Sequence, residues 1–300
     1  MNNLKPHCDP GDFPLADVYA VIGNPIAHSR SPEIHTLFAK QTNQAIHYGK
    51  IYSEVAEFEK NVIDFFSRGG RGINVTVPFK DRAYLLSEVL TPRAKAAGVV
   101  NVLWMVGGKI YGDNSDGIGL VRDLIRNHVL LKNQKILLLG AGGAAQGVLL
   151  PLLEMNPQSI TVVNRTYSKA KNLVDKFIDL ASVHHVQLNV VECEDIGQIG
   201  PFDLIINATA SGLSQESPLL DEQIAHLVQS SKDSAKTTTA YDMVYGKETK
   251  FLTQMLNNQA HTIDGLGMLV EQAAESFEKW RGAEVIGKLD TSAVLEMLRA

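Results

Sequence analysis

The chain has 300 residues, of which 45% are hydrophobic and 20% are charged, and its formal net charge is −5. This composition is typical of a globular protein with a large core, and the length suits one large domain or two ordinary ones. The negative net charge argues against a nucleic-acid partner held through phosphate contacts. The two cysteines, Cys8 and Cys193, lack metal-ligand spacing, so we expect no metal site. Their number fits a reducing cytoplasm, and residues 1–13 lack the apolar segment of a signal peptide.

The N-terminal part of the chain reads as a tail, a strand and a helix. Residues 1–16 contain three prolines and little periodicity, which indicates a loose tail. An apolar run over 18–23 predicts the first strand. In the loop that follows, Ser31 is predicted to cap a helix whose first residue is Pro32. Taken alone, Ser31 and the nearby Ser29 are consistent with ordinary capping and turn formation.

A strand over 46–52 and a helix over 55–66 are predicted next, followed by a strand that begins at Ile73. Alternation along this strand places Asn74 and Thr76 on the same face, opposite Ile73, Val75 and Val77, and Pro78 ends the strand. Lys80 follows at the strand's carboxyl end, where α/β folds bind ligands. For a lone lysine, a solvated position on the first turn of a helix is the alternative.

Two apolar runs, 99–105 and 109–111, flank Gly107-Gly108 and predict a hairpin. Asn101 interrupts the first run, so it either pairs in the core or faces a ligand. Asp116 follows in a stretch that reads, in isolation, as an ordinary Asx turn. A helix is predicted over 118–126.

The run over 135–147 predicts a buried strand that breaks into a glycine turn and then a helix. Residues 136–139 are branched and apolar, as in a parallel strand covered on both faces. Gly140 permits the tight turn, Gly142 lets a pyrophosphate approach the backbone, and residues 143–144 open a helix whose N–H groups face the anion. Glycines and Pro151 interrupt the uncharged stretch, which argues against a membrane span.

Strands over 159–163 and 202–207 continue the alternation of strand and helix, and a last strand is predicted over 238–245. A helix over 248–258 and a glycine turn with a helix start over 263–272 complete the chain. This order predicts a doubly wound dinucleotide-binding domain. A glycine-rich turn in an unrelated α/β domain remains the alternative.

The second strand of this domain ends in Asn164 and Arg165, with Lys169 one turn later. A domain that prefers NAD usually carries Asp or Glu there to bind the ribose hydroxyls. Arg165 can instead stack on adenine and pair with a 2′-phosphate, so the sequence predicts NADP.

Several motifs together resemble the shikimate dehydrogenase family. In chain order they are Gly23–Pro32, Asn74–Lys80, Gly112–Gly117, Gly140–Ala144, Asn164–Thr166, Tyr241–Tyr245 and Asp264–Met268. The Ser-x-Ser-Pro and Asn-Val-Thr-Val-Pro-Phe-Lys pieces are highly specific. They favour functional roles for Ser29, Ser31, Lys80 and Asp116 over the ordinary readings given above.

The resemblance implies a two-domain α/β enzyme with an N-terminal substrate domain and a Rossmann-type NADP-binding domain. The implied limits are a tail over 1–16, the substrate domain over 17–116, the NADP domain over 117–258, and helices over 259–300 that return to the substrate domain. The implied activity (EC 1.1.1.25) is reversible reduction of 3-dehydroshikimate to shikimate by NADPH, on the route to aromatic amino acids. The enzyme is expected to be a cytoplasmic monomer or homodimer without nucleic-acid or membrane partners.

The resemblance also implies a role for individual residues. Lys80 and Asp116 form the catalytic pair. Substrate hydroxyls and carboxylate are held by Ser29, Ser31, Asn74, Thr76, Asn101, Asp116, Tyr245 and Gln272. The cofactor is lined by Gly140, Ala141, Gly142, Gly143, Ala144, Asn164, Arg165, Thr166, Tyr167, Ser168, Lys169, Met243 and Gly265. The chain departs from some relatives near Pro92, where they carry an acidic residue.

Three rival functions remain at this point. A quinate/shikimate dehydrogenase, often NAD-using, has the same scaffold, but Arg165 favours the NADP enzyme. A non-catalytic NADP-binding regulator has no need of a proton donor, so the presence of both Lys80 and Asp116 weighs against it. A folate-linked dehydrogenase lacks support from the loop that carries Ser29 and Ser31.

Overall fold

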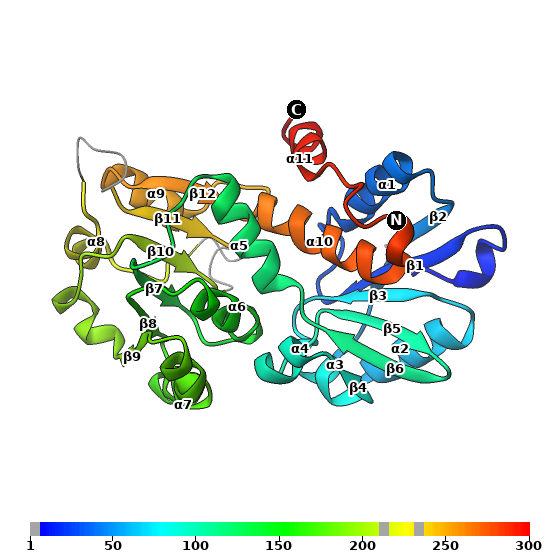
Figure 1. The fold of residues 1–300 in the computed structure, drawn as a ribbon, viewed down its shortest axis with the longest axis horizontal. Helices are drawn as coiled ribbons and strands as arrows, with labels where there is room; N and C mark the ends of the chain where they lie inside the picture. Colours follow the sequence, from blue (N-terminus) through cyan, green and yellow to red (C-terminus); the bar gives the residue numbers. More distant parts are fainter. Residues whose placement is uncertain (1–6, 210–215, 231–236) are drawn as a thin grey trace. The chain divides into compact units, whose positions relative to one another are not determined.

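The structure, a computed structural model, describes residues 7–209, 216–230 and 237–300 (Figure 1). The described residues divide into two compact units, one within 1–119 and 269–300 and the other within 120–268. Each unit has a six-stranded sheet of its own. The predicted two-domain α/β fold is therefore confirmed.

The limits of the units differ from the expected ones, which fell after residues 116 and 258. The observed limits fall after Gly119 and Met268. The second shift arises because residues 261–264 form a strand of the second sheet rather than the start of a returning helix.

The first unit contains a mixed sheet with the strand order β2-β1-β3-β5-β6-β4. Its strands are β1 (Asp17–Gly23), β2 (Ile46–Tyr52), β3 (Gly72–Val75), β4 (Val89–Leu90), β5 (Val102–Val106) and β6 (Lys109–Asp113). β1 is parallel to β2 and β3, and β5 is antiparallel to β3 and β6. The third strand ends earlier than predicted, since Val77 lies outside it and is 41% exposed.

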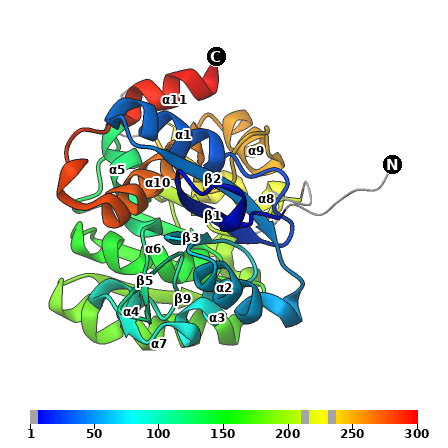
Figure 2. The same ribbon diagram turned by 90° about the vertical axis from the view of Figure 1, so that its right-hand side faces the viewer.

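Within the described residues of the first unit, seven helices lie wholly or partly in it. They are α1 (Ser31–Thr42), α2 (Phe58–Ser67), α3 (Lys80–Leu86), α4 (Pro92–Ala97), the first residues of α5 (Asp116–Arg126), most of α10 (Leu266–Arg281) and α11 (Thr291–Arg299). α1 packs along β2 and β1 (Figure 2). The predicted start of the second helix, at residue 55, is a separate 3-10 turn, Val55–Glu57.

The start of α1 corrects one prediction. Arg30 occupies the N-cap position and Ser31 is the first helical residue, so Ser31 is not the cap. The backbone N–H of Ser31 donates to Oγ of Ser29 at 3.3 Å. The hydroxyl of Ser29 thus satisfies a free N–H of the first turn, as a capping side chain does.

The expected loose tail is wrong for residues 7–16, and residues 1–6 lie outside the described part of the chain. Cys8 is 5% exposed and belongs to the core of the first unit. Phe13 stacks on His47, with ring centroids 3.5 Å apart. Cys8 packs closely on Gly49, because a Cβ there would lie 2.5 Å from Sγ of Cys8.

The second unit contains a fully parallel sheet with the strand order β12-β11-β10-β7-β8-β9. Its strands are β7 (Lys135–Leu139), β8 (Ser159–Val163), β9 (Gln187–Val191), β10 (Leu204–Asn207), β11 (Thr239–Asp242) and β12 (His261–Asp264). This is the doubly wound order, with the change of direction between β7 and β10. The glycine turn follows β7 and therefore lies at that switch point.

Helices cover both faces of this sheet (Figure 1). They are the remainder of α5, α6 (Gly143–Glu154), α7 (Tyr167–Val183), α8 (Asp221–Leu227), α9 (Lys250–Asn257) and the start of α10. Along β7, Ile136 and Leu138 join the core formed with α6 and α7, whereas Leu137 and Leu139 join the core formed with α8 and α9. The prediction of a strand covered on both faces is confirmed. None of the helices in the described ranges has the length and hydrophobicity needed to span a bilayer.

Candidate active site

Lys80 and Asp116 form an ion pair in the first unit. Nζ of Lys80 donates to Oδ2 of Asp116 at 2.5 Å, and the two side chains are 14% and 7% exposed. Lys80 is the first residue of α3, and Asp116 is the first residue of α5, where the positive end of the helix dipole favours a carboxylate. The pair thus presents a primary amine, held by a carboxylate, that can give or take a proton.

Asn101 joins this pair to a second amide. Its Nδ2 lies 2.8 Å from Oδ1 of Asp116, 3.1 Å from Oγ of Ser115 and 3.2 Å from Oε1 of Gln272. Only two hydrogens are available on Nδ2, so these three acceptors share them. Asn101 is 2% exposed. Asn101 is therefore hydrogen-bonded to neighbouring polar side chains, and one of these is the carboxylate of the candidate catalytic pair.

Asn74 extends the group toward β2 and α10. Its Oδ1 accepts from the hydroxyl of Tyr48 at 2.7 Å, and its Nδ2 donates to Oγ of Ser276 at 2.9 Å. Nδ2 also lies 3.3 Å from the backbone oxygen of Asn101. Thr76 follows β3 and is half-buried, with its N–H donating to the oxygen of Ile22 at 3.0 Å. The structure thereby brings Asn74, Asn101, Asp116, Lys80 and Gln272 together in one connected set of hydrogen bonds.

The two serines of the Ser-x-Ser-Pro motif lie close to each other. Oγ of Ser29 donates to Oγ of Ser31 at 3.2 Å, and the residues are 9% and 4% exposed. One helical turn after Ser31, the ring of His35 stacks on Tyr48, with centroids 4.1 Å apart. Burial lowers the pKa of His35 to about 3, an effect that a smaller contribution from Asn74 opposes. His35 is therefore neutral at physiological pH.

Three contributors to this group were not found from the sequence: Tyr48, Ser115 and Ser276. Tyr48 lies on β2 and Ser276 on α10, far from Asn74 along the chain. Ser276 stands four residues after Gln272, so helical spacing places both on one face of α10. That spacing was the available signal for Ser276.

The glycine turn of the second unit has the geometry that a dinucleotide requires. Gly140 has φ of +111°, and a Cβ there would approach the backbone of Ala208 to 3.2 Å. Gly142 is the N-cap of α6, and a Cβ added to it would meet no atom within 4 Å. The first turn of α6 therefore presents N–H groups beside open space, which suits a pyrophosphate.

The end of β8 lies beside this turn, because Leu139 pairs with Val163 and the N–H of Gly140 donates to the oxygen of Val163 at 2.7 Å. The stretch that follows is half-buried at Asn164 and exposed at Arg165, Thr166, Tyr167, Ser168 and Lys169. It carries two cations and no carboxylate. These residues fit a cofactor that bears an extra phosphate on its adenosine ribose.

Met243, Tyr245 and Gly265 follow the neighbouring strands of the second unit. The N–H of Met243 donates to the oxygen of Asn207 at 3.0 Å, which holds it at the carboxyl end of β10. A Cβ on Gly265 would lie 2.5 Å from the oxygen of Met243, so glycine is needed for this close approach. Tyr245 lies two residues after Met243 in the same unit, whereas the other predicted substrate residues belong to the first.

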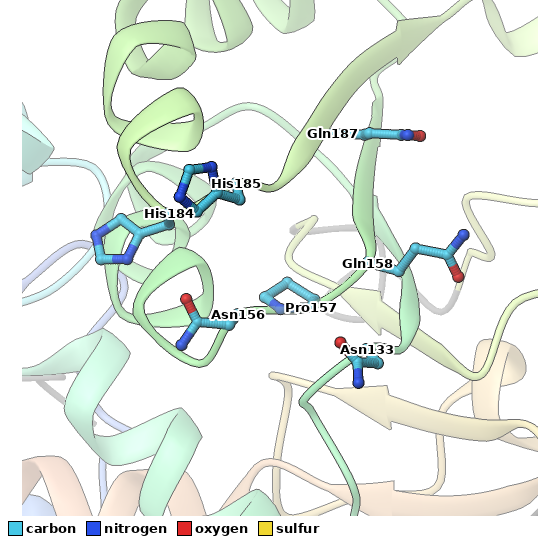
Figure 3. Close-up of a pocket in the computed structure, with 7 residues that line it drawn as sticks. All are labelled: Asn133, Asn156, Pro157, Gln158, His184, His185 and Gln187. Atoms are coloured by element: carbon cyan, nitrogen blue, oxygen red, sulfur yellow. The ribbon is translucent and has the colours of Figure 1, made fainter.

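A surface pocket of about 500 Å³ lies elsewhere in the second unit (Figure 3). It is lined by Asn133, Asn156, Pro157, Gln158, His184, His185 and Gln187. These residues precede β7 and β8 or begin β9, so the pocket is at the amino ends of the strands. Gly140 lies at the carboxyl ends of these strands, so the pocket is separate from the candidate cofactor site. In the described ranges, no group of three or more His, Cys, Asp or Glu is arranged to hold a metal ion.

Three family descriptions match successive parts of the chain. They are the shikimate dehydrogenase substrate binding domain over residues 21–103, shikimate / quinate 5-dehydrogenase over 123–267, and the shikimate 5′-dehydrogenase C-terminal domain over 265–285. A protein from Cupriavidus taiwanensis named shikimate dehydrogenase (NADP(+)) is 47% identical over 290 residues, which cover 95% of this chain and 94% of that protein. The chain belongs to the shikimate dehydrogenase family.

Solved structures agree with this family assignment. An Ael1 enzyme from Pseudomonas putida superposes with a TM-score of 0.80 at 40% identity, over 94% of this chain and 98% of that one. Shikimate 5-dehydrogenase from Thermus thermophilus, in complex with NADP(H) and shikimate, superposes with a TM-score of 0.78 at 29% identity over the same shares. The family recognised from the motifs is confirmed.

Proposed function

We propose that this chain catalyses the reversible, NADPH-dependent reduction of 3-dehydroshikimate to shikimate. Membership of the shikimate dehydrogenase family supports the activity, and relatives with the NADP(+) designation support the cofactor. The observation that carries the proposal is the contact of 2.5 Å between Nζ of Lys80 and Oδ2 of Asp116, in a largely buried group of polar side chains.

Lys80 acts as the general acid in reduction and the general base in oxidation. When bound, NADPH supplies the hydride that reaches the ketone carbon. An alkoxide then develops on the substrate oxygen, and the ammonium of Lys80 donates the proton that this oxygen needs. In the reverse direction, the neutral amine accepts the proton from the substrate hydroxyl.

Asp116 orients the amine and a substrate hydroxyl at the same time. Its Oδ1 is held by Asn101 at 2.8 Å and its Oδ2 by Lys80, so the carboxylate cannot rotate freely. A fixed carboxylate limits the amine to one direction, which lowers the entropy cost of reaching the reactive geometry.

The remaining polar residues hold the substrate. The hydroxyl pair of Ser29 and Ser31 suits a carboxylate, since each hydroxyl can donate one hydrogen bond. Ring hydroxyls of the substrate are bound by Asn74, Thr76, Asn101, Asp116, Tyr245 and Gln272. These residues fall in the proposed substrate domain, 17–116, apart from Tyr245 and Gln272.

The cofactor is held in the proposed NADP domain, 117–258, and by Gly265. The backbone of Gly140, Ala141, Gly142, Gly143 and Ala144 binds the pyrophosphate at the start of α6. The exposed stretch Asn164, Arg165, Thr166, Tyr167, Ser168 and Lys169 binds the adenosine 2′-phosphate, with Arg165 as the main partner. Met243 and Gly265 also line the cofactor.

We also propose that the enzyme works in the cytoplasm as a monomer or a homodimer, without nucleic-acid or membrane partners. The net charge of −5 argues against a nucleic-acid partner, because binding the many phosphates of a nucleic acid favours a basic surface.

The experiment that tests the proposed function is the initial rate of NADP⁺ reduction with shikimate, compared with quinate and with NAD⁺. We expect fast turnover only for shikimate with NADP⁺. Comparable rates with quinate or NAD⁺ would instead identify a quinate/shikimate dehydrogenase of broader specificity. Tight NADPH binding without turnover of either substrate would contradict an enzymatic role.

A further inference from the structure

The carboxylate of Asp113 is the most heavily bonded carboxylate near the candidate catalytic pair, although it has no assigned role. Asp113 ends β6 and is 1% exposed. Its Oδ1 accepts from Oγ1 of Thr91 at 2.5 Å, from Nε of Arg93 at 2.7 Å and from the N–H of Asn114 at 2.7 Å. Its Oδ2 accepts from Nη2 of Arg93 at 2.5 Å. The guanidinium therefore binds both oxygens in a fork, which fixes the plane of the carboxylate.

The surroundings keep Asp113 ionised. Burial raises the pKa of Asp113, but the hydrogen bonds and charge of Arg93 outweigh this effect, so the pKa lies below its usual value. Arg93 also contacts Glu275 at 2.9 Å, and Nζ of Lys279 lies 3.6 Å from Oδ2 of Asp113. The two cations, Arg93 and Lys279, thus balance the charges of the two carboxylates beside the turn that leads to Asp116.

Hydrogen bonds transmit this fixed geometry from Asp113 to Asp116. The N–H of Asn114 is bound to Asp113, and Oδ1 of Asn114 accepts from the N–H of Asp116 at 3.1 Å. Across the turn, the N–H of Asn101 donates to the oxygen of Asp113 at 3.0 Å, and Oδ1 of Asn101 accepts from the N–H of Ser115 at 2.8 Å. Asn114, Ser115 and Asp116 are therefore each bound to Asp113 or to a residue that is itself hydrogen-bonded to Asp113.

We propose that Arg93 and Asp113 are positioning residues that hold the turn 113–116 so that the carboxylate of Asp116 meets Lys80 and Asn101. Neither residue touches the reacting atoms. The proposal rests on the proposed roles of Lys80 and Asp116. A buried ion pair contributes little net stability compared with apolar residues of the same size. Positioning of Asp116 would explain why the pair of Arg93 and Asp113 stands at this turn.

The test is the steady-state and isotope kinetics of Asp113→Asn and Arg93→Lys. Asp113→Asn keeps the size of the side chain and removes its charge, whereas Arg93→Lys keeps the charge and removes the fork. We expect Asp113→Asn to lower kcat by about 10²-fold, the scale of a displacement of about 1 Å, and Arg93→Lys to lower it less. The Kd for NADPH should stay unchanged. Slower chemistry should also raise the primary isotope effect on kcat measured with NADPH deuterated at the transferred position, which a smaller folded fraction would not do.

A double-mutant cycle with Asp116→Asn tests the route of the effect. If Asp113 acts through Asp116, then Asp113→Asn should have little further effect on kcat in the Asp116→Asn background. Equal losses in both backgrounds would overturn the proposal.

The matched control is Arg82→Lys. Arg82 lies two residues after Lys80 and forms a similar fork on Glu59, with side chains 29% and 38% exposed, but it does not bond to the turn 113–116. We expect the wild-type kcat and isotope effect. Wild-type kinetics in both Asp113→Asn and Arg93→Lys, even with a lower melting temperature, would overturn the proposal. If Asp113→Asn does not fold, Arg93→Lys decides. Absence of turnover in the wild-type protein would contradict the proposed function instead.

Discussion

In the first unit the candidate site consists of buried side chains that bond to one another, whereas in the second unit it consists of backbone and exposed side chains. Asn74, Asn101 and Asp116 are each at most 5% exposed and share hydrogen bonds. Arg165 and its neighbours are exposed, and Gly142 borders open space. This difference separates two kinds of expected damage: substitutions in the first unit should act on the rate of chemistry, and those in the second on cofactor affinity.

The largest expected effect is that of Lys80→Ala. Removal of a positioned acid–base group should lower kcat by about 10²- to 10⁴-fold. NADPH affinity, measured by fluorescence titration, should stay normal because the proposed cofactor residues belong to the other unit. Arg82→Ala, on the same helix, is the control and should keep its kcat. Near-normal turnover of Lys80→Ala would refute the role assigned to Lys80.

Arg165→Ala should produce the converse pattern. One or two hydrogen bonds from a cation to a phosphate correspond to about tenfold to several hundredfold in affinity. We therefore expect the KM for NADPH to rise by that factor, with little change in the KM for NADH or in kcat. Equal effects on the two cofactors would show that Arg165 does not bind the 2′-phosphate.

A pair of glycine substitutions separates folding from binding in the second unit. Gly142→Ala should fold normally, since φ is −83° and the added Cβ meets no atom, but its methyl group should raise the Kd for NADPH about tenfold. Gly140→Ala should lower the free energy of unfolding by about 1–3 kcal/mol, because φ is +111°. Urea denaturation and NADPH titration measure the two effects. Normal NADPH affinity in Gly142→Ala would place the pyrophosphate elsewhere.

The smallest expected effect on the reaction is that of His35→Phe, which should act on acid stability. The pKa of His35 is about 3 in the folded protein and about 6.5 when unfolded, so the unfolded state binds more protons below pH 6.5. Stability is thus lost as the pH falls from about 6.5 toward 3, by about 2 kcal/mol between pH 7 and pH 5.

Phenylalanine preserves the stacking on Tyr48 and cannot be protonated, so His35→Phe should lose less stability over this range. The exposed His7 provides the control, and His7→Gln should follow the wild-type curve. Urea denaturation at several pH values measures the difference. Identical pH dependence in His35→Phe and wild type would show that His35 does not titrate with unfolding.

The elements that could be predicted from the sequence are those with a strong, local pattern of apolar residues. The strand at 136–139 and the glycine turn after it were predicted and confirmed, because four branched apolar residues followed by Gly140 are typical of a central parallel strand that ends in a tight turn. β9 was missed because it is an edge strand of only five residues, Gln187–Val191, of which Leu188 alone is buried. The burial of Cys8 was missed because it depends on the neighbouring Gly49, which no local pattern connects to it.

In the candidate site, the sequence indicated the proposed catalytic pair but not the residues that hold its neighbours in place. Lys80 and Asp116 were paired through family resemblance, and the structure places their charged atoms in contact. The contacts of Tyr48 and Ser276 with Asn74 depend on pairings 26 and 202 residues apart, which are set only by the folded sheet and α10. Arg93 was missed for the same reason, since its partner Asp113 lies 20 residues away.

The buried position of Cys8 gives the protein a natural reporter of local opening. The residue is 5% exposed, and burial and nearby acidic residues raise the pKa of its thiol to about 11, so little thiolate forms in the native state. Cys193 is only partly buried. A disulfide reagent added at neutral pH should therefore label Cys193 first. Cys8 should react only when the segment around it separates from β2. The rate of the slow phase measures how often that edge of the first sheet opens.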